Sequence, residues 1–250
     1  MFGIFVKKAS IMEKRIKELE NHVIICGFGR NGKRAAIELL ENNERILIIE
    51  KESEIISQIN ELENLLYLLG DSTEEQILKI AQVESAKAII TTMPNDADNL
   101  FVVLTARDLN KNIKIISRAS EENSDYKLRR AGADNIIMPD KLGGQQMAKM
   151  VTRPDTVEFI NFVLHQKNMD VKLYEVFCLH MDKYNVNKSI GDFNFRKRSG
   201  ANIIGVKRGD GTYVFNPTKD LQLNCEDKIF LLGTKEQVVE FKDILYKQKH

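Results

Sequence analysis

A glycine-rich turn at residues 27–32 constrains the fold of this chain more than any other feature. Its residues are Gly27, Phe28, Gly29, Arg30, Asn31 and Gly32, and they directly follow an apolar run at residues 22–26. In this GxGxxG spacing the first glycine permits a sharp strand-to-helix turn, the second lets backbone approach a pyrophosphate, and the third lets the helix pack closely. The phosphates then meet a helix N-terminus, whose free N–H groups and dipole stabilise an anion. The turn therefore indicates a nucleotide-binding fold.

An acidic residue stands where such a fold contacts a ribose. The second apolar run, residues 45–49, ends on Glu50, 18 residues after Gly32, and Lys51 follows it. A carboxylate at this position can accept hydrogen bonds from both hydroxyls of an adenosine ribose. A single glutamate at a strand end is more often only a solvated side chain. The order of strand, glycine turn, helix, strand and acid favours a bound adenine nucleotide instead, either NAD or NADH, or ADP or ATP.

Composition is that of a soluble globular protein. Of the 250 residues 43% are hydrophobic, and 37 Lys and Arg nearly balance 36 Asp and Glu. Without a net field, binding to nucleic acid has no electrostatic support. No apolar stretch reaches the ~20 residues that span a bilayer, so we expect this chain itself to be soluble. Cys26, Cys178 and Cys225 stand in apolar runs without metal-ligand spacing, which predicts reduced, buried thiols in the cytoplasm.

Strands and helices alternate over the first part of the chain, which predicts a parallel sheet covered by helices on both faces. The expected strands are residues 22–26, 45–50, 65–68, 86–92, 113–117 and 135–138, and the expected helices are 31–41, 54–61, 74–81, 96–109 and 122–131. The fold class is α/β, with a Rossmann-like doubly wound sheet over residues 21–140. Residues 1–20 form a charged segment before it.

The alternation stops after residue 140. Residues 141–151 and 155–166 are expected to form a helix-turn-helix crossover arm, interrupted at Pro154. The second helix is apolar around most of its circumference, as either a core helix or a helix inserted into a partner subunit would be. Residues 167–250 are expected to form a small α+β domain, with strands at 172–180, 203–207, 212–215 and 227–232 and a helix at 235–246.

Further polar residues follow the strand ends, where ligands bind in open α/β sheets. They are Asp71 and Ser72 after the third strand, Thr91 and Thr92 after the fourth, and Arg118 after the fifth. Asp71 could alternatively cap the next helix, and Arg118 could form a surface ion pair with Glu121 or Glu122 instead of binding a phosphate. The four histidines have no metal-ligand spacing, and GxSxG and Walker motifs are absent. We expect no catalytic residues and no metal site.

Several motifs in order resemble the RCK domain, which regulates potassium conductance. They are residues 14–32 (KRIKELENHVIICGFGRNG), 70–73 (GDST) and 131–134 (AGAD), with residues 189–208 and 226–233 resembling its companion TrkA-C subdomain. The resemblance implies a cytosolic gating module that forms dimers through the crossover arm. Such dimers assemble into rings, here an octamer, beneath a membrane pore. It also implies a possible interface role for Phe101 and Val102.

Two features of the sequence indicate which ligand such a gating module binds and whether it is part of a channel. Calcium-gated members carry carboxylates at the end of the fifth strand, whereas this chain has Ser117-Arg118-Ala119-Ser120, which argues against that site and suits a nucleotide. Residues 1–20 look like a linker from an upstream pore helix. We therefore expect part of a potassium channel on the cytoplasmic side of the inner membrane. The alternatives are a free-standing regulatory subunit of a Trk/Ktr-type potassium transporter and, with less support, an NAD-dependent oxidoreductase.

Overall fold

The structure is a computed structural model that describes residues 12–60, 65–165, 170–182 and 185–246. The chain divides into two compact units, Met1–Met147 and Ala148–His250, and the division falls within helix α7 (Pro139–Thr152). The predicted linker residues 1–11, the helix end at residue 61, residues 166–169 of the arm and C-terminal domain, and residues 247–250 lie outside the described part.

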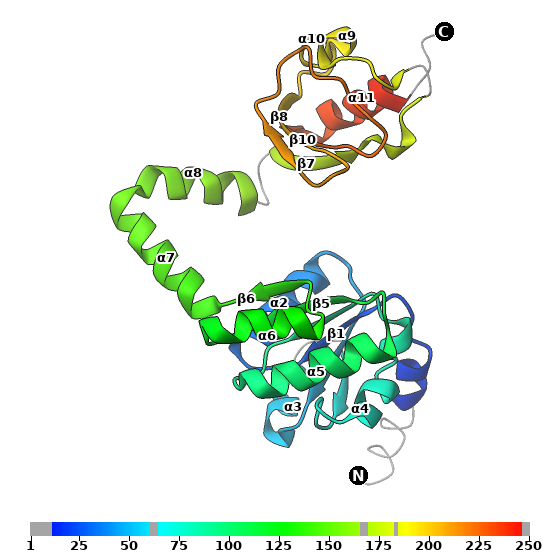
Figure 1. The fold of residues 1–250 in the computed structure, drawn as a ribbon, viewed down its shortest axis with the longest axis vertical. Helices are drawn as coiled ribbons and strands as arrows, with labels where there is room; N and C mark the ends of the chain where they lie inside the picture. Colours follow the sequence, from blue (N-terminus) through cyan, green and yellow to red (C-terminus); the bar gives the residue numbers. More distant parts are fainter. Residues whose placement is uncertain (1–11, 61–64, 166–169, 183–184, 247–250) are drawn as a thin grey trace. The chain divides into compact units, whose positions relative to one another are not determined.

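The first unit is built on a six-stranded parallel sheet (Figure 1). Its strand order is β3-β2-β1-β4-β5-β6, so the order reverses between β1 and β4, as in doubly wound folds. The strands are β1 (Val23–Cys26), β2 (Ile46–Glu50), β3 (Leu66–Leu69), β4 (Ala88–Thr91), β5 (Lys114–Arg118) and β6 (Asn135–Ile137). All six predicted strands are confirmed, with ends shifted by no more than two residues.

Helices cover both faces of this sheet and explain its apolar strands. In β1, Ile24 and Cys26 pack into one core cluster with residues of α4, α5 and α6, whereas Val23 and Ile25 pack into another with α2 and α3. The helices are α2 (Arg30–Glu41), α3 (Ser53–Asn60), α4 (Glu75–Ile80), the short η1 (Val83–Ser85), α5 (Asp96–Leu109) and α6 (Glu122–Ala131). The predicted Rossmann-like architecture is confirmed.

The segment before β1 is attached to the first unit. Residues 12–17 are helical, and Ile16 and Leu19 are buried in the core cluster on the α4–α6 side. The Ser85 hydroxyl donates to the Leu19 carbonyl at 2.9 Å, and the Asn21 N–H donates to the Ser85 carbonyl at 2.9 Å. The segment is therefore fixed to the first unit near the amino ends of β1 and β4.

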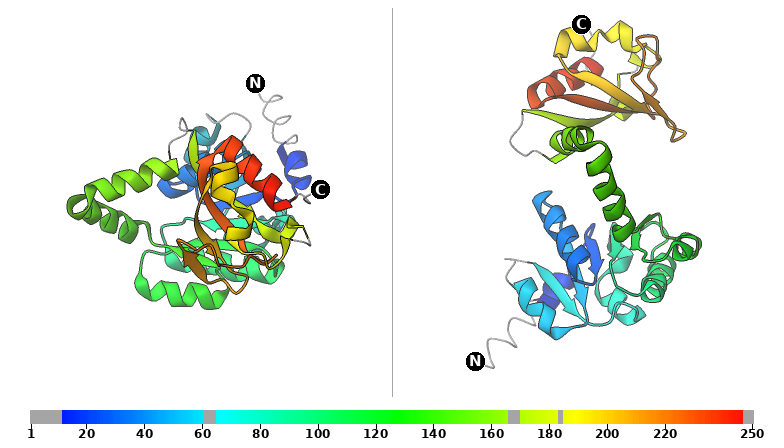
Figure 2. Two further views of the ribbon diagram at one scale, coloured as in Figure 1. Left: turned by 90° about the horizontal axis from the view of Figure 1, so that it is seen from above. Right: turned by 90° about the vertical axis from the view of Figure 1, so that its left-hand side faces the viewer.

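The second unit is a four-stranded antiparallel sheet with helices on one face. Its strand order is β7-β10-β8-β9, and α11 lies along one face (Figure 2). The elements are α8 (Pro154–His165), β7 (Val171–Phe177), η2 (Cys178–His180), α9 (Ile190–Phe193), α10 (Phe195–Ser199), β8 (Asn202–Lys207), β9 (Tyr213–Phe215), β10 (Lys228–Thr234) and α11 (Lys235–Tyr246). Stacked rings of Phe193, Phe195 and Phe241 form the centre of its core.

The predicted small α+β domain is confirmed, with one correction to a strand. The strand expected to reach His180 ends at Phe177, and residues 178–180 turn into η2. The N–H of Cys178 still donates to the carbonyl of Asp227 at 2.9 Å. Asp227 lies one residue before β10, which begins at Lys228, so β7 has no partner strand beyond this point. The short helices α9 and α10 were not predicted.

Candidate functional site

Each glycine of the turn has a separate structural role. Gly27 has a φ of +91°, which turns the chain sharply between β1 and α2. A Cβ on Gly32 would lie 2.0 Å from the Gly27 carbonyl oxygen, so only glycine allows the helix this close to the turn. Gly29 is the N-cap of α2, and a Cβ there would meet nothing within 4 Å. The backbone at the start of α2 is therefore open to a ligand.

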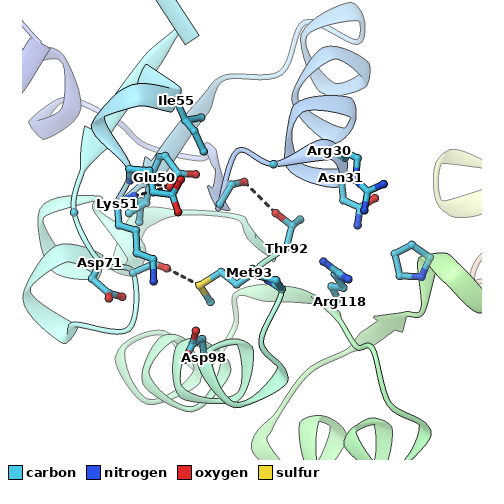
Figure 3. A pocket seen from close by; sticks show the side chains of 18 of the residues that line it. Arg30, Asn31, Glu50, Lys51, Ile55, Asp71, Thr92, Met93, Asp98 and Arg118 are labelled. Carbon is cyan, nitrogen blue, oxygen red and sulfur yellow. Dashed lines mark hydrogen bonds between the residues drawn. The ribbon is translucent and has the colours of Figure 1, made fainter. Parts of the chain in front are cut away.

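A cavity of about 540 Å³ lies over this turn, at the carboxyl ends of the parallel strands (Figure 3). It occupies the region where the strand order reverses, which is where open α/β sheets bind ligands. Of the predicted site residues, those that line it are Gly27, Gly29, Arg30, Asn31, Glu50, Lys51, Asp71, Ser72, Thr92 and Arg118. The structure thus brings ten of the predicted residues together around one cavity.

Glu50 is fixed by the backbone around it. Its Oε2 accepts the Phe28 N–H at 2.7 Å, and its Oε1 accepts the N–H groups of Lys51 at 2.8 Å and Glu52 at 3.0 Å. The residue is only 7% exposed. Because two donors already occupy Oε1, Oε2 is the oxygen with capacity left for a ribose hydroxyl. Glu50 therefore also anchors the glycine turn to the end of β2, a role that its place in the sequence did not reveal.

Asp71 and Ser72 form the wall of the cavity that follows β3. Asp71 Oδ1 accepts the N–H of Thr73 at 2.9 Å and its hydroxyl at 2.7 Å, and these bonds hold the pKa of the Asp71 carboxyl below its ordinary value. The helix-cap alternative for Asp71 is wrong, because the N-cap of α4 is Glu74. The Ser72 hydroxyl donates to the Met93 sulfur at 3.3 Å, which joins this wall to the loop after β4.

Arg118 ends β5 and points into the cavity (Figure 3). Its Nε is buried without a hydrogen-bond partner, and Nη2 makes only a long contact of 3.4 Å to the Ser120 hydroxyl. Among the described residues, neither Glu121 nor Glu122 forms an ion pair with it, since Glu122 pairs with Lys141. A buried guanidinium nitrogen that lacks an acceptor suits an anionic ligand that supplies one.

Three predicted residues do not line the cavity. Phe28 is buried in the core on the α2–α3 side and contributes only its backbone N–H to Glu50, while Gly32 lies behind the turn. The expectation that Thr91 contacts the ligand is wrong: it is fully buried, and its hydroxyl lies 2.9 Å from that of Ser117. Thr92, on the next position, turns toward the cavity and donates to the carbonyls of Cys26 and Gly27.

Sequence reasoning missed part of the lining. Ile49, Ile55 and Met93 give the cavity apolar surface, and other lining residues are Glu52, Gly70, Pro94, Asp98, Pro139 and Asp140. Pro139 and Asp140 are the first residues of α7, so the first turn of the arm is part of the cavity wall. The sequence does not predict Pro139 and Asp140 as site residues, because they lie more than a hundred residues from the glycine turn and belong to no motif with it.

Helices α7, α8 and α5 expose apolar side chains. No residue of α7 is buried, and Phe159, Ile160 and Phe162 of α8 are exposed. On α5, Phe101 is 58% exposed and Leu104 is 48% exposed. The expectation that Val102 lies at an interface is wrong, because its side chain is fully buried in the core of the first unit.

Comparison with known proteins finds two domain models and several potassium channel and uptake proteins that are similar to this chain. The model of the TrkA-N domain matches residues 23–139, and that of the TrkA-C domain matches residues 179–246. The chain is 39% identical over 233 residues to Potassium channel protein 1 of Methanocaldococcus jannaschii, covering 92% of this chain and 68% of that protein. It is 26% identical over 219 residues to a Trk system potassium uptake protein TrkA homolog of Methanothermobacter thermautotrophicus, covering 88% and 96% respectively.

The fold also matches a solved assembly. The structure of the human SLO3 gating ring aligns with a TM-score of 0.68 and 16% sequence identity, over 92% of this chain and 46% of that one. At this identity the likeness concerns the fold alone. Within the described ranges, no helix is long and apolar enough to cross a membrane.

Proposed function

The chain belongs to the RCK family, in which a TrkA-N domain is joined to a TrkA-C domain, and we propose that it is the ligand-sensing gating module of a potassium channel. Its similarity to a potassium channel protein extends over 92% of its length and supports this role. The chain spans 68% of that relative, and the pore would be supplied by sequence outside the matched part. The module would then lie on the cytoplasmic side of the membrane.

The ligand we propose is an adenine nucleotide, NAD or NADH, or ADP or ATP. The observation that carries this proposal is the cavity, which has open backbone at Gly29 and, among the described residues, a buried Nε of Arg118 without a hydrogen-bond partner. Phosphates at the start of α2 would accept its free N–H groups. The Oε2 of Glu50 would accept a ribose hydroxyl, and the apolar surface of Ile55 and Met93 would take the base.

Gating requires that the ligand bind one conformation better than another. Coupling of about 1 to 3 kcal/mol changes an equilibrium roughly 5- to 150-fold. The first turn of α7 lines the cavity through Pro139 and Asp140, so a nucleotide would contact the arm directly. We propose that this contact transmits ligand binding to the arm and, through assembly, to the pore.

Assembly through the arm is the second part of the proposal. The exposed Phe159, Ile160 and Phe162 of α8 favour insertion into a partner subunit over a helix buried within one chain. Such dimers would form a ring, an octamer, in which the exposed Phe101 and Leu104 of α5 supply a further contact. Apolar interfaces of this kind commonly bury ~2,000 Å² or more.

Two alternatives remain distinct from this proposal. A free-standing transporter subunit is favoured by the TrkA homolog, because the chain covers 96% of that protein. An oxidoreductase would need an acid or base placed beside the nucleotide, and two carboxylates of the lining already accept backbone N–H groups, at Glu50 and Asp71. The relatives named above are a potassium channel protein and a potassium uptake protein. We therefore propose a binding role without chemistry.

The experiment that tests nucleotide binding uses two substitutions at one open position. Gly29 has φ −67° and space for a Cβ in the ligand-free chain, so Gly29→Ala and Gly29→Asp should both fold. Because the second glycine lets backbone approach a pyrophosphate, Gly29→Ala should weaken binding, and Gly29→Asp, which also puts a carboxylate against the phosphates, should weaken it further. At a hundred times the dissociation constant, NAD, NADH, ADP or ATP should add about 2.7 kcal/mol to the stability of the wild type. The same gain in Gly29→Asp, or no gain in the wild type with any nucleotide, would refute the site.

Gating itself is tested in the full-length protein. Single-channel open probability should respond to the nucleotide that stabilises the wild type, should need more nucleotide in Gly29→Ala, and should not respond in Gly29→Asp. Open probability that is indifferent to nucleotide in all three proteins would overturn the gating role while leaving binding intact.

A further inference from the structure

The first turns of α5 hold two of the loops that surround the cavity. Asn99, which is fully buried, accepts the Met93 N–H at 3.1 Å and donates to the Met93 carbonyl at 2.9 Å. Met93 lines the cavity and contacts Ser72. The loop after β4 is therefore fixed to α5 by a side chain that itself does not line the cavity.

Asp96 makes the corresponding connection to the loop after β5. Its Oδ1 accepts the Ser120 N–H at 2.8 Å and its Oδ2 accepts the Glu121 N–H at 3.1 Å, while the Ser120 hydroxyl lies 3.4 Å from the Pro94 carbonyl. Glu121 is the N-cap of α6 and makes no side-chain capping bond of its own. A carboxylate from α5 thus accepts the N–H of the N-cap residue of a different helix and the N–H of the residue before it.

The loop held in this way begins directly after Arg118. Arg118 is the last residue of β5 and is paired with Ile137 of β6, so its backbone is fixed by the sheet. Its side chain meets the loop at Ser120, whose hydroxyl lies 3.4 Å from Nη2. Among the described residues, Nε of this guanidinium has no hydrogen-bond partner and Nη2 has only the long contact to Ser120. The loop therefore supplies, through Ser120, the side-chain contact that the structure gives the guanidinium.

We infer that Asp96 is a positioning residue of the nucleotide site, which holds Arg118 ready for the ligand phosphates through its bonds to Ser120 and Glu121. The inference rests on the proposed nucleotide-binding function and adds to it a residue outside the cavity lining. A group that is already positioned loses less conformational entropy on binding, so fixing the loop raises affinity without a direct contact.

The Asp96 carboxyl is ionised at neutral pH. Burial alone would raise the pKa of its carboxyl, but hydrogen bonds from Ser124, Glu121 and Ser120 outweigh this effect and hold the pKa below its ordinary value. The N–H groups of Ser120 and Glu121 therefore donate to an ionised carboxylate at neutral pH. The Asp96→Asn substitution removes this negative charge with little change in side-chain shape.

The test is a double-mutant cycle between Asp96 and Arg118, with ADP as the probe. Affinities are measured on the full chain, by calorimetry for tight variants and by NMR titration to millimolar ADP for weak ones. We expect Asp96→Asn to weaken ADP binding about tenfold, within the range of coupling found in one hydrogen-bonded network. In an Arg118→Ala background, Asp96→Asn should have no further effect. Asp108→Asn is the matched control, because Asp108 lies on the same helix and pairs only with Lys111 at the surface.

The outcomes separate this inference from the function on which it rests. Equal ADP affinity in wild type and Asp96→Asn would overturn it, and so would a tenfold loss that persists without Arg118, because Asp96 would then act only as a helix cap. If Asp96→Asn does not fold, Asp96→Glu, which keeps the charge but displaces it, carries the same cycle with a smaller loss. A wild-type protein that binds no ADP, NAD, NADH or ATP refutes the nucleotide site itself.

Discussion

Glu50→Gln should destabilise the protein even when no nucleotide is present. The carboxylate accepts three backbone N–H groups, from Phe28, Lys51 and Glu52, in a site that is 7% exposed. A glutamine offers one acceptor oxygen. If that oxygen replaces Oε1, the amide NH2 faces the N–H of Phe28, and two donors then oppose each other. A buried donor left unsatisfied costs about 1 to 3 kcal/mol, and the remaining bonds lose their ionic character, so we expect a loss of about 2 to 4 kcal/mol.

Urea unfolding of the ligand-free protein measures this loss, and a second series with saturating nucleotide separates it from binding. Glu38→Gln is the control, since Glu38 lies exposed on α2 with only a weak contact of 3.9 Å to Arg34, and it should change stability by less than about 0.5 kcal/mol. If Glu50→Gln is as stable as the wild type without ligand, Glu50 does not anchor the turn. A variant that then loses only the nucleotide-dependent gain would show Glu50 to be a ribose contact alone.

Three further predictions concern other parts of the chain. Arg208→Ala should cost about 3 to 5 kcal/mol in urea unfolding, because it leaves the Asp227 carboxylate, whose side chain is 1% exposed, without its cation; stability equal to wild type would contradict this. In the native protein at pH 8 only Cys225 should react readily with a thiol reagent, because burial raises the pKa of Cys26 and Cys178 to about 12, and all three should react after unfolding. Ile160→Asp should convert a dimer to a monomer or prevent folding, as measured by light scattering, whereas a wild type that is monomeric at micromolar concentration would argue against assembly through the arm.

The sheet and the glycine turn could be predicted because their signals are local. Apolar runs separated by helical stretches define a parallel sheet, and each glycine of the turn is required by backbone geometry within a few residues. The small helices α9 and α10 escaped prediction because they have four and five residues, too few to establish a helical period. Their boundary is made by Asn194 at a positive φ of 51°, which no pattern of hydrophobicity reports.

The side on which a residue of a helix or strand lies is harder to predict from the sequence than the helix or strand itself. Thr91 ends β4 and is buried, whereas Thr92 is the next residue and lines the cavity. The sequence offers two equivalent threonines and does not show which of them reaches the ligand. Helix α5 carries apolar side chains on both its buried and its exposed side, so the sequence does not show which of them are exposed. Phe101 and Leu104 are on the exposed side, and Val102 is in the core. The bond from the Phe28 N–H to Glu50 joins two segments that are 22 residues apart and has no signature in sequence.

The contact between the arm and the cavity also depends on tertiary structure, and it bears on the proposed gating. Pro139 and Asp140 reach the cavity because β6 lies beside β5 at one edge of the sheet and α7 starts directly after it. Since no residue of α7 is buried within this chain, few contacts of the single chain oppose a change in its direction. In the gating that we propose, a ligand bound against this first turn would act on the direction of α7 with the ~1 to 3 kcal/mol typical of coupling between sites. The cavity walls that follow β3, β4 and β5 are instead tied together through Ser72, Asn99 and Asp96, so the first turn of α7 is the part of the wall most able to respond.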